Sequence, residues 1–142
     1  MKTFMGRDSY DWAGFGLLCL VLGSMVAVML SCEPVQAQDG YASYYTVASC
    51  KREGTSGVYT ASGEPYIEQA MTCALPVKPD NRIYSVYGVV SQKTVYVRHN
   101  DRGPGKRPQA KGVIIDLTPE AFRQVCGSLE QGKCEVSIQG VL

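Results

Sequence analysis

Two acidic side chains of the sequence are candidates for proton transfer. Asp101 lies in the segment Asn100-Asp101-Arg102-Gly103-Pro104, and Glu64 ends the segment Thr60-Ala61-Ser62-Gly63-Glu64. A carboxyl group can donate a proton and its carboxylate can accept one, provided that its surroundings tune its pKa to the task. The alternatives are that Asp101 is a turn residue before Gly and Pro, and that Glu64 is a solvated acid near the start of a helix.

Two more titratable side chains lie close to Asp101 in the sequence. Asp116 interrupts an apolar run at 113–117, where a carboxylate needs a partner. We expect a structural acid there, pairing with Arg102 or capping a loop. His99 is the only histidine. We expect His99 to be an exposed loop-edge residue that could act beside Asp101 only if the backbone kinks there.

Basic side chains cluster around the same segment. Arg98, Arg102, Lys106, Arg107 and Lys111 fall within fourteen positions, opposed only by Asp101. Such a cluster is either a solvated loop or the wall of a groove for an acidic polymer. The whole chain carries a formal charge of only +1, which does not indicate a nucleic-acid binder.

The N-terminal part of the 142-residue chain is typical of an export segment, because no charged residue occurs from position 12 to position 32. Small residues at 35–37 favour cleavage after Ala37, which divides the chain into a signal (1–37) and one domain (38–142). Two alternatives remain: an uncleaved membrane anchor through residues 12–32, or a lipoprotein with Cys32 as the lipidated residue. Each predicts an exported protein of the periplasm or cell envelope.

Four cysteines lie in the expected domain: Cys50, Cys73, Cys126 and Cys134. An even number in a small exported chain indicates disulfides, and three pairings are possible. The short interval between Cys126 and Cys134 favours a local bridge, which leaves Cys50 with Cys73. Zinc is the alternative, but the sequence has no Cys-x-x-Cys pair and only His99 as a histidine, so we predict neither a metal site nor a cofactor.

Short strands must position these residues. Alternating or β-branched segments predict strands at 41–48, 58–60, 83–90, 94–98, 113–117 and 134–138, with a buried segment at 71–74. Helices are expected at 62–69 and from Pro119 to about 126, the second with Thr118 as its capping residue. Gly and Pro predict a loop over 100–111. The fold class is therefore mainly β: a small six-stranded barrel with two short helices after the N-terminal segment.

Four motifs, in this order along the chain, resemble the rare lipoprotein A family of bacterial septal-ring lytic transglycosylases. They are Tyr41-Ala42-Ser43-Tyr44-Tyr45, Thr60-Ala61-Ser62-Gly63-Glu64, Asn100-Asp101-Arg102-Gly103-Pro104 and Gly112-Val113-Ile114-Ile115-Asp116-Leu117. The resemblance covers residues 40–139. It implies a double-psi β-barrel that cleaves peptidoglycan glycan strands between N-acetylmuramic acid and N-acetylglucosamine. It also implies a product with a 1,6-anhydro ring and possible partners at the division site.

The resemblance assigns roles to individual residues. Asp101 and Glu64 match the family's two acids, so we expect Asp101 to donate and then accept the proton and Glu64 to orient substrate or stabilise positive charge. Leu75 stands where the family has a histidine, which bears on full activity. We expect substrate contacts from Tyr44, whose ring could stack on a sugar, and from Arg102 and His99.

Two other functions are compatible with the same barrel. The first is a non-catalytic glycan-binding module of the expansin kind, which the replacement of the family histidine by Leu75 favours. The second is a small disulfide-bonded effector or inhibitor, against which the retained Asp101 and Glu64 argue.

Overall fold

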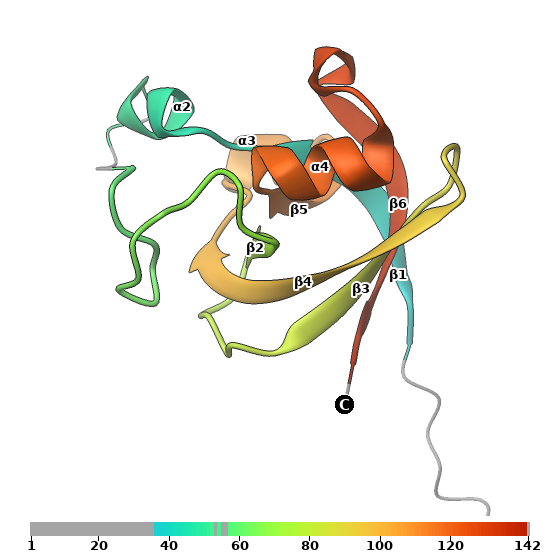
Figure 1. The fold of residues 1–142 in the computed structure, drawn as a ribbon, viewed down its shortest axis with the longest axis horizontal. Coiled ribbons are helices and arrows are strands. Elements are labelled where there is room, and N and C mark those ends of the chain that lie inside the picture. The colour runs from blue at the N-terminus through green and yellow to red at the C-terminus, as the bar shows by residue number, and fades with distance from the viewer. Residues whose placement is uncertain (1–35, 53, 55–56, 142) are drawn as a thin grey trace, which may run out of the picture. The chain divides into compact units, whose positions relative to one another are not determined.

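The structure is a computed structural model that describes residues 36–52, 54 and 57–141 (Figure 1). The expected export signal or anchor at 1–37 therefore lies almost wholly outside the described residues, and so does Cys32. Within the described ranges, no helix combines the length and the apolar character needed to cross a bilayer. The boundary after Ala37 stays a prediction.

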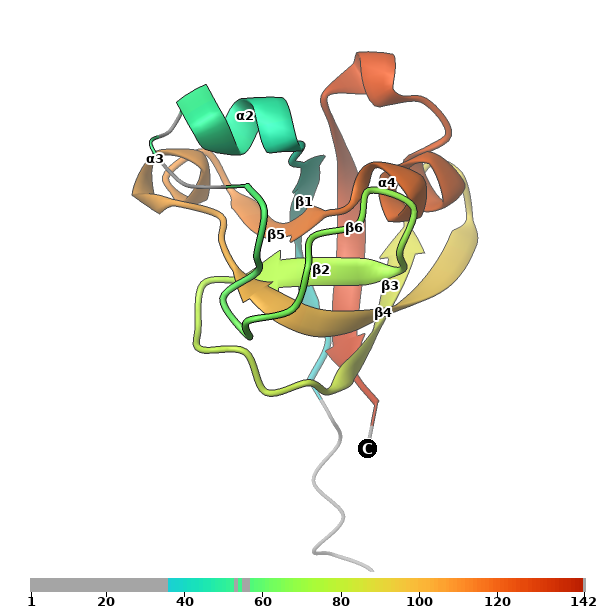
Figure 2. The ribbon, with the colours of Figure 1, turned by 60° about the vertical axis from the view of Figure 1, so that its left-hand side comes forward.

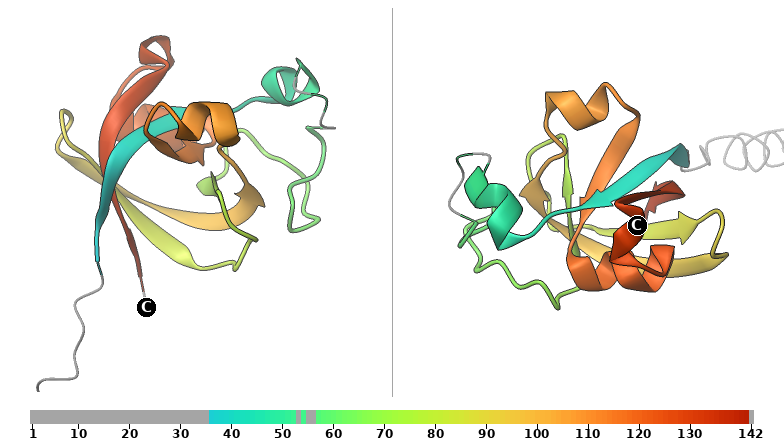
Figure 3. Two further views of the ribbon diagram at one scale, coloured as in Figure 1. Left: turned by 180° about the vertical axis from the view of Figure 1, so that it is seen from behind. Right: turned by 90° about the horizontal axis from the view of Figure 1, so that it is seen from above.

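Six strands close into a barrel in the order β1-β5-β2-β4-β3-β6 (Figures 1 and 2). The pairs β1–β5 and β2–β4 are parallel, and the other four pairs are antiparallel; β1 and β6 run side by side in Figure 3. This confirms the predicted six-stranded, mainly β fold. The strands are β1 (Gln38–Tyr44), β2 (Thr72–Leu75), β3 (Ile83–Gly88), β4 (Lys93–Arg102), β5 (Val113–Leu117) and β6 (Lys133–Gly140).

Strand alternation fills the barrel with apolar side chains. Val95 and Val97 of β4 are buried, as are Ile115 and Leu117 of β5, whereas the alternate residues Tyr96 and Asp116 are more exposed. Helix α4 (Pro119–Cys126) packs against β1, β3, β4 and β5 and inserts the fully buried Phe122 into the core. Because Phe122 packs among the strand residues, the barrel and α4 form one core. Burial of each large apolar side chain in this core contributes about 1.5–3 kcal/mol to stability.

The end of β4 differs from the sequence prediction. Asn100 to Arg102 were expected in a loop, but they continue β4, because β2 pairs with β4 in parallel and brings Ala74 opposite Asp101 and Leu75 opposite Arg102. Backbone pairing thus extends the strand through polar residues that local composition assigns to a turn. The loop begins only at Gly103 and contains the short helix α3 (Lys106–Gln109).

Three other segments also differ from their predictions. The strand expected at 58–60 is reduced to a single bridge between Tyr59 and Pro65, and the sixth strand of the barrel is instead β2, within the segment expected only to be buried. Thr46 and Ser49 form a reciprocal cap, with Thr46 N–H donating to Ser49 Oγ (2.8 Å) and Ser49 N–H donating to Thr46 Oγ1 (3.1 Å). This cap starts helix α2 (Val47–Arg52) where the strand was expected to continue. The helix expected at 62–69 does not form; the segment makes turns, and Gly63 adopts a φ of +88° that a helix excludes.

Thr118 begins helix α4 without capping it. Pro119 occupies the first turn as predicted, but the Thr118 hydroxyl donates to the carbonyl oxygens of Ala70 (2.5 Å) and Thr72 (3.3 Å). The hydroxyl is drawn away because β2 and the segment before it pass directly beside the helix start. Its bonds therefore attach α4 to β2.

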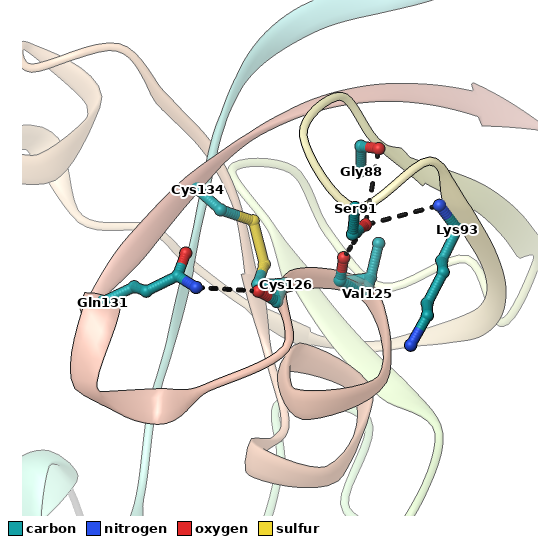
Figure 4. Close-up of a disulfide and its surroundings, with 7 residues drawn as sticks. All are labelled: Gly88, Ser91, Lys93, Val125, Cys126, Gln131 and Cys134. Carbon is teal, nitrogen blue, oxygen red and sulfur yellow. Dashed lines mark hydrogen bonds between the residues drawn. A yellow bond between two sulfur atoms is a disulfide. The ribbon is translucent and has the colours of Figure 1, made fainter.

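One of the two expected disulfides is present. Cys126 at the end of α4 is bonded to Cys134 of β6 across the turn that contains the 3-10 helix η1 (Leu129–Gln131), and Ser91 Oγ donates to the Val125 carbonyl beside it (2.5 Å, Figure 4). The pairing of Cys50 with Cys73 is wrong: both are thiols. Cys73 is wholly buried in β2, where burial raises the pKa of its thiol, whereas Cys50 belongs to α2 outside the barrel.

Candidate active site

A cleft of about 580 Å³ lies beside the carboxyl end of β4 and is lined in part by residues of α2 and α3. Figure 2 shows the positions of these two helices in the fold. It contains Asp101, Arg102 and Tyr44, three of the residues singled out by the sequence. Glu64 and His99 do not line it. The full lining is Ser43, Tyr44, Tyr45, Ser49, Cys50, Gly57, Tyr59, Tyr66, Ala74, Asp101, Arg102, Gly103, Gly105, Lys106, Arg107, Pro108 and Asp116.

Backbone amides hold the Asp101 carboxylate. Its Oδ1 accepts hydrogen bonds from the N–H of Ala61 and from its own neighbour Arg102, both at 2.8 Å. Both of these main-chain hydrogen bonds end on Oδ1. A carboxylate fixed in this way by main-chain donors keeps one orientation in the cleft.

Four adjacent strands place a row of side chains on the floor of the cleft. Asp101 of β4 lies opposite Ala74 of β2, Ala74 lies opposite Asp116 of β5, and Asp116 lies opposite Ser43 of β1. All four residues line the cleft. Neighbouring strands are about 4.7–4.9 Å apart, so roughly 9–10 Å separate the backbones of Asp101 and Asp116, with only the small Ala74 between them. The row therefore presents two carboxylates to one hollow.

Asp116 belongs to this site, although the sequence indicated only a structural acid. Ser43 Oγ donates a short hydrogen bond to Asp116 Oδ1. Gly103 makes room for the other oxygen, since a Cβ at position 103 would lie 3.0 Å from Oδ2. The alternation of β5 could have predicted this position of Asp116. Val113, Ile115 and Leu117 point into the barrel, so the side chain of Asp116 between them points outward.

Glu64 forms an ion pair beside the cleft. Its two carboxylate oxygens accept hydrogen bonds from the Arg98 guanidinium at 2.6 and 2.8 Å, and Asn100 Nδ2 donates to one of them at 3.2 Å. Hydrogen bonds from Arg98 and then from Asn100 lower the pKa of the Glu64 carboxyl. The charge of Glu64 is thus compensated, and its expected contact with substrate stays a prediction.

The Glu64 ion pair attaches the segment 60–64 to β4. Within the segment, Thr60 N–H donates to the Glu64 carbonyl (2.8 Å) and Gly63 N–H to the Thr60 carbonyl (2.9 Å), which closes a tight turn. Across to β4, Ser62 N–H donates to the Asn100 carbonyl (3.0 Å). This docking carries the Ala61 N–H to Asp101, so the two acid motifs of the sequence meet through the backbone.

Two tyrosines form one wall of the cleft. The rings of Tyr45 and Tyr66 lie 4.8 Å apart, and the Tyr66 hydroxyl donates to the Tyr45 carbonyl at 2.6 Å. The Tyr45 hydroxyl is buried and has no hydrogen-bond partner among the described residues. Burial and then the nearby charge of Asp101 raise the pKa of this phenol. Tyr45 is therefore a neutral phenol close to Asp101. The sequence indicated it only as the last residue of the motif Tyr41–Tyr45 and as a ring that could stack on a sugar, not as a neighbour of the acid.

Two of the residues expected to contact substrate, Tyr44 and Arg102, line the cleft. Tyr44 lines the cleft and also packs against Phe122 at 5.1 Å, so its ring is half core and half surface. Arg102 is exposed at the cleft, where Lys106 and Arg107 of α3 join it. The cluster of basic residues in the sequence thus forms part of a cleft wall, whereas Arg98 serves the ion pair with Glu64.

His99 is fully buried inside the barrel, so the expectation of an exposed loop-edge residue is wrong. Its position follows from β4 pairing on both sides, with β2 and β3, which turns alternate side chains inward. Nδ1 lies 2.9 Å from Asp80 Oδ1, and the ring stands edge-on to Tyr84 at 5.9 Å. Because His99 does not line the cleft, its predicted substrate contact has no geometric support.

Leu75 offers the site no titratable group. Its side chain is buried and lines a different hollow, and its carbonyl accepts the Gly103 N–H at 3.0 Å. In the described part of the chain, no group of three or more His, Cys, Asp or Glu side chains is arranged to hold a metal ion. The carboxyl groups that line the cleft are those of Asp101 and Asp116, with the phenol of Tyr45 beside them.

Comparison with known sequences identifies relatives of the whole barrel. The model of a family described as "Lytic transglycolase" matches residues 37–138. An endolytic peptidoglycan transglycosylase RlpA of Pasteurella multocida is 37% identical over 103 residues, covering 72% of this chain and 31% of the relative. One of Campylobacter jejuni is 36% identical over 90 residues, covering 63% of this chain and 29% of the relative. The chain thus spans about a third of the length of these curated relatives.

Two solved structures share the fold. A Streptomyces papain inhibitor superposes with a TM-score of 0.56 at 20% identity, covering 75% of this chain and 96% of the inhibitor. An expansin of Clavibacter michiganensis superposes with a TM-score of 0.54 at 21% identity, covering 75% of this chain and 51% of the expansin. With the family match, these likenesses confirm the predicted double-psi β-barrel.

Proposed function

The chain belongs to the lytic transglycolase family, and from this premise we propose that it cleaves the glycan strands of peptidoglycan in the cell envelope. The bond broken would join N-acetylmuramic acid to N-acetylglucosamine, and the product would carry a 1,6-anhydro ring. The observation that carries the proposal is the cross-strand row, which presents Asp101 and Asp116 to one cleft.

The reaction needs one proton delivered and one removed. The leaving O4 of N-acetylglucosamine takes a proton as the C1–O4 bond breaks, and the C6 hydroxyl of the muramyl residue attacks C1 and loses its own proton. No water is consumed, so one group can act first as acid and then as base. Asp101 suits this role because two N–H donors fix its Oδ1 in the cleft, and the exchanged proton is then carried on Oδ2.

Asp116 takes the second role, which the sequence suggested for Glu64. Bond breaking leaves positive charge on the sugar ring, and a fixed carboxylate stabilises such charge. Ser43 orients Asp116 in the cleft, whereas the charge of Glu64 is compensated by Arg98 outside it. Glu64 then acts as a positioning residue, because its ion pair holds the turn whose Ala61 N–H donates to Asp101.

Sacculus digestion tests the proposal. Purified full-length protein is incubated with peptidoglycan sacculi, and soluble products are analysed by mass spectrometry. We expect anhydro-muramyl ends from the wild type and from the control Asp39→Asn, whose acid is exposed on β1 and does not line the cleft. We expect Asp101→Asn to release at most about a hundredth as many anhydro-muramyl ends as the wild type.

The competing function is a glycan-binding module without catalysis. Leu75 favours it, because the described cleft holds no imidazole in place of the family histidine. Protein that sediments with sacculi yet releases no product, in wild type as in Asp101→Asn, would establish the binding module and overturn the enzyme.

A further inference from the structure

A second hollow of about 420 Å³ borders the cleft. Ser43, Arg107 and Pro108 line both, so the cleft and the second hollow share one edge. Lys111 and Lys133 add two cations that the cleft itself lacks. We call this second hollow the basic hollow; its lining is completed by Val113, Gln131 and Gly132.

The charges of the basic hollow come from three separate parts of the chain. Arg107 belongs to α3, Lys111 to the turn before β5, and Lys133 to the first position of β6. None of the lining residues is acidic, and none of the three cations forms an ion pair with an acid of the described segments. A concave surface lined by charge of one sign concentrates potential for an opposite charge, so the basic hollow favours an anion.

The nearest acids are engaged by hydroxyl groups. Glu135, two residues after Lys133 on β6, accepts a hydrogen bond from the Tyr41 hydroxyl at 3.3 Å and does not line the hollow. Lys133 Nζ instead lies over the Tyr41 ring, 4.5 Å from its centroid. Asp116 lies on the cleft side of Ser43 and accepts the Ser43 hydroxyl. Among the described residues, neither acid forms an ion pair with a cation of the basic hollow.

We propose that the basic hollow binds a carboxylate of the glycan strand at a muramyl residue next to the scissile bond, an inference that rests on the proposed function. The row from Asp101 through Asp116 ends at Ser43, which is also the border of the basic hollow. A strand lying along the row would continue over this border.

The carboxylate makes the basic hollow selective for one of the two sugars. Each muramyl residue bears a lactyl group, whose carboxylate is ionised when no stem peptide is attached; when a peptide is attached, its own carboxylates supply the charge. N-acetylglucosamine is neutral. Cations at a fixed distance from Asp101 thus bind only muramyl positions, which sets the register of the strand and hence which bond lies over Asp101.

Paired lysine substitutions test this subsite in the full-length protein. Lys111→Gln/Lys133→Gln removes two charges from the basic hollow; Lys78→Gln/Lys93→Gln removes two from exposed positions outside both hollows. On denuded glycan we expect the first pair to raise KM about tenfold, equal to ~1.4 kcal/mol, with kcat within about twofold, and the control pair to match wild type. High salt should shrink the difference.

Chemical modification of the substrate identifies the anion. On glycan whose carboxylates are converted to neutral amides, the KM of the wild type should rise to that of Lys111→Gln/Lys133→Gln. If the lysine effect appears on denuded strands, the ligand is the lactyl carboxylate; if it appears only on strands with stem peptides, the ligand is a peptide carboxylate. A KM equal to that of the control pair on both strands, or an effect that persists on amidated glycan, overturns the subsite.

A binding measurement separates this inference from the proposed function. If the wild type releases no product, co-sedimentation with sacculi of the same four preparations replaces the kinetics: wild type, both lysine pairs and Asp101→Asn. Weaker sedimentation of Lys111→Gln/Lys133→Gln alone supports the subsite even though the enzyme proposal has failed. Equal sedimentation of all four overturns the subsite.

Discussion

The two acid motifs of the sequence occupy contrasting environments. Asp101 lies in a cleft, is held by backbone N–H groups and faces a second carboxylate across Ala74. Glu64 lies beside the cleft and is held by the Arg98 guanidinium and the Asn100 amide. Main-chain donors orient a carboxylate without cancelling its charge, whereas a guanidinium compensates it. The contrast separates a group that can exchange a proton from a group that holds the structure in place.

Removing the proton carrier should have the largest effect. Asp101→Asn keeps the shape and the hydrogen bonds to Oδ1 but loses general acid–base catalysis, so we expect product release to fall by about 10²–10⁴-fold. The initial rate of anhydro-end formation measures this. Thermal unfolding should stay close to wild type, and retention of most of the activity would show that Asp101 does not carry the proton.

The second carboxylate should matter less. Asp116→Asn removes the charge that stabilises the sugar ring, and we expect kcat to fall by about 10²-fold with little change in KM. Ser43→Ala leaves that charge but loosens its orientation, so a smaller loss in the same direction is expected. A higher KM with unchanged kcat would instead assign Asp116 to substrate binding alone.

The Glu64 ion pair should behave as one unit. Glu64→Gln and Arg98→Gln should each lower kcat by about tenfold, and the double variant should be no worse than the poorer single, because either change releases the turn at 60–64. A double-mutant cycle on product release measures this coupling. Additive losses would show that Glu64 also acts directly on substrate.

The smallest effect concerns acid stability. Because the pKa of Glu64 is lowered in the fold, its contribution to stability is present above its unfolded pKa and is lost as the pH falls through the lower folded value. Wild type should therefore be more stable than Glu64→Gln at pH 7, and the difference should close below about pH 4. Urea unfolding of both proteins at the two pH values measures it, with Glu130→Gln as an exposed control.

Local patterns predict much of the barrel. Alternation at 94–98 and 113–117 depends only on neighbouring residues, and both segments are strands with the expected buried faces. The bridge between Cys126 and Cys134 also follows from a short interval that any fold must close. The motif around Asp101 identifies a residue of the cleft only through its place among four ordered motifs that resemble the family, because the local composition by itself favours a turn residue.

The remaining features depend on pairing between distant segments. Asn100 to Arg102 become strand because β2 lies beside them, and the same pairing buries His99. Cys73 is placed in the core and Cys50 in α2, so their expected bond does not form. These outcomes follow from contacts across the barrel, which no local pattern encodes.

For the three acids Asp101, Glu64 and Asp116, the sequence determines some properties and the tertiary structure determines others. That Asp101 and Glu64 carry charge, and that Asp116 alternates with apolar residues, is determined by the chain itself. Which of them share a cleft is decided by strand register: β2 sets Ala74 against both Asp101 and Asp116, and the docked turn pairs Glu64 with Arg98. The physical reason is that a carboxylate's chemistry depends on the donors and charges around it, and these come from residues far apart in sequence.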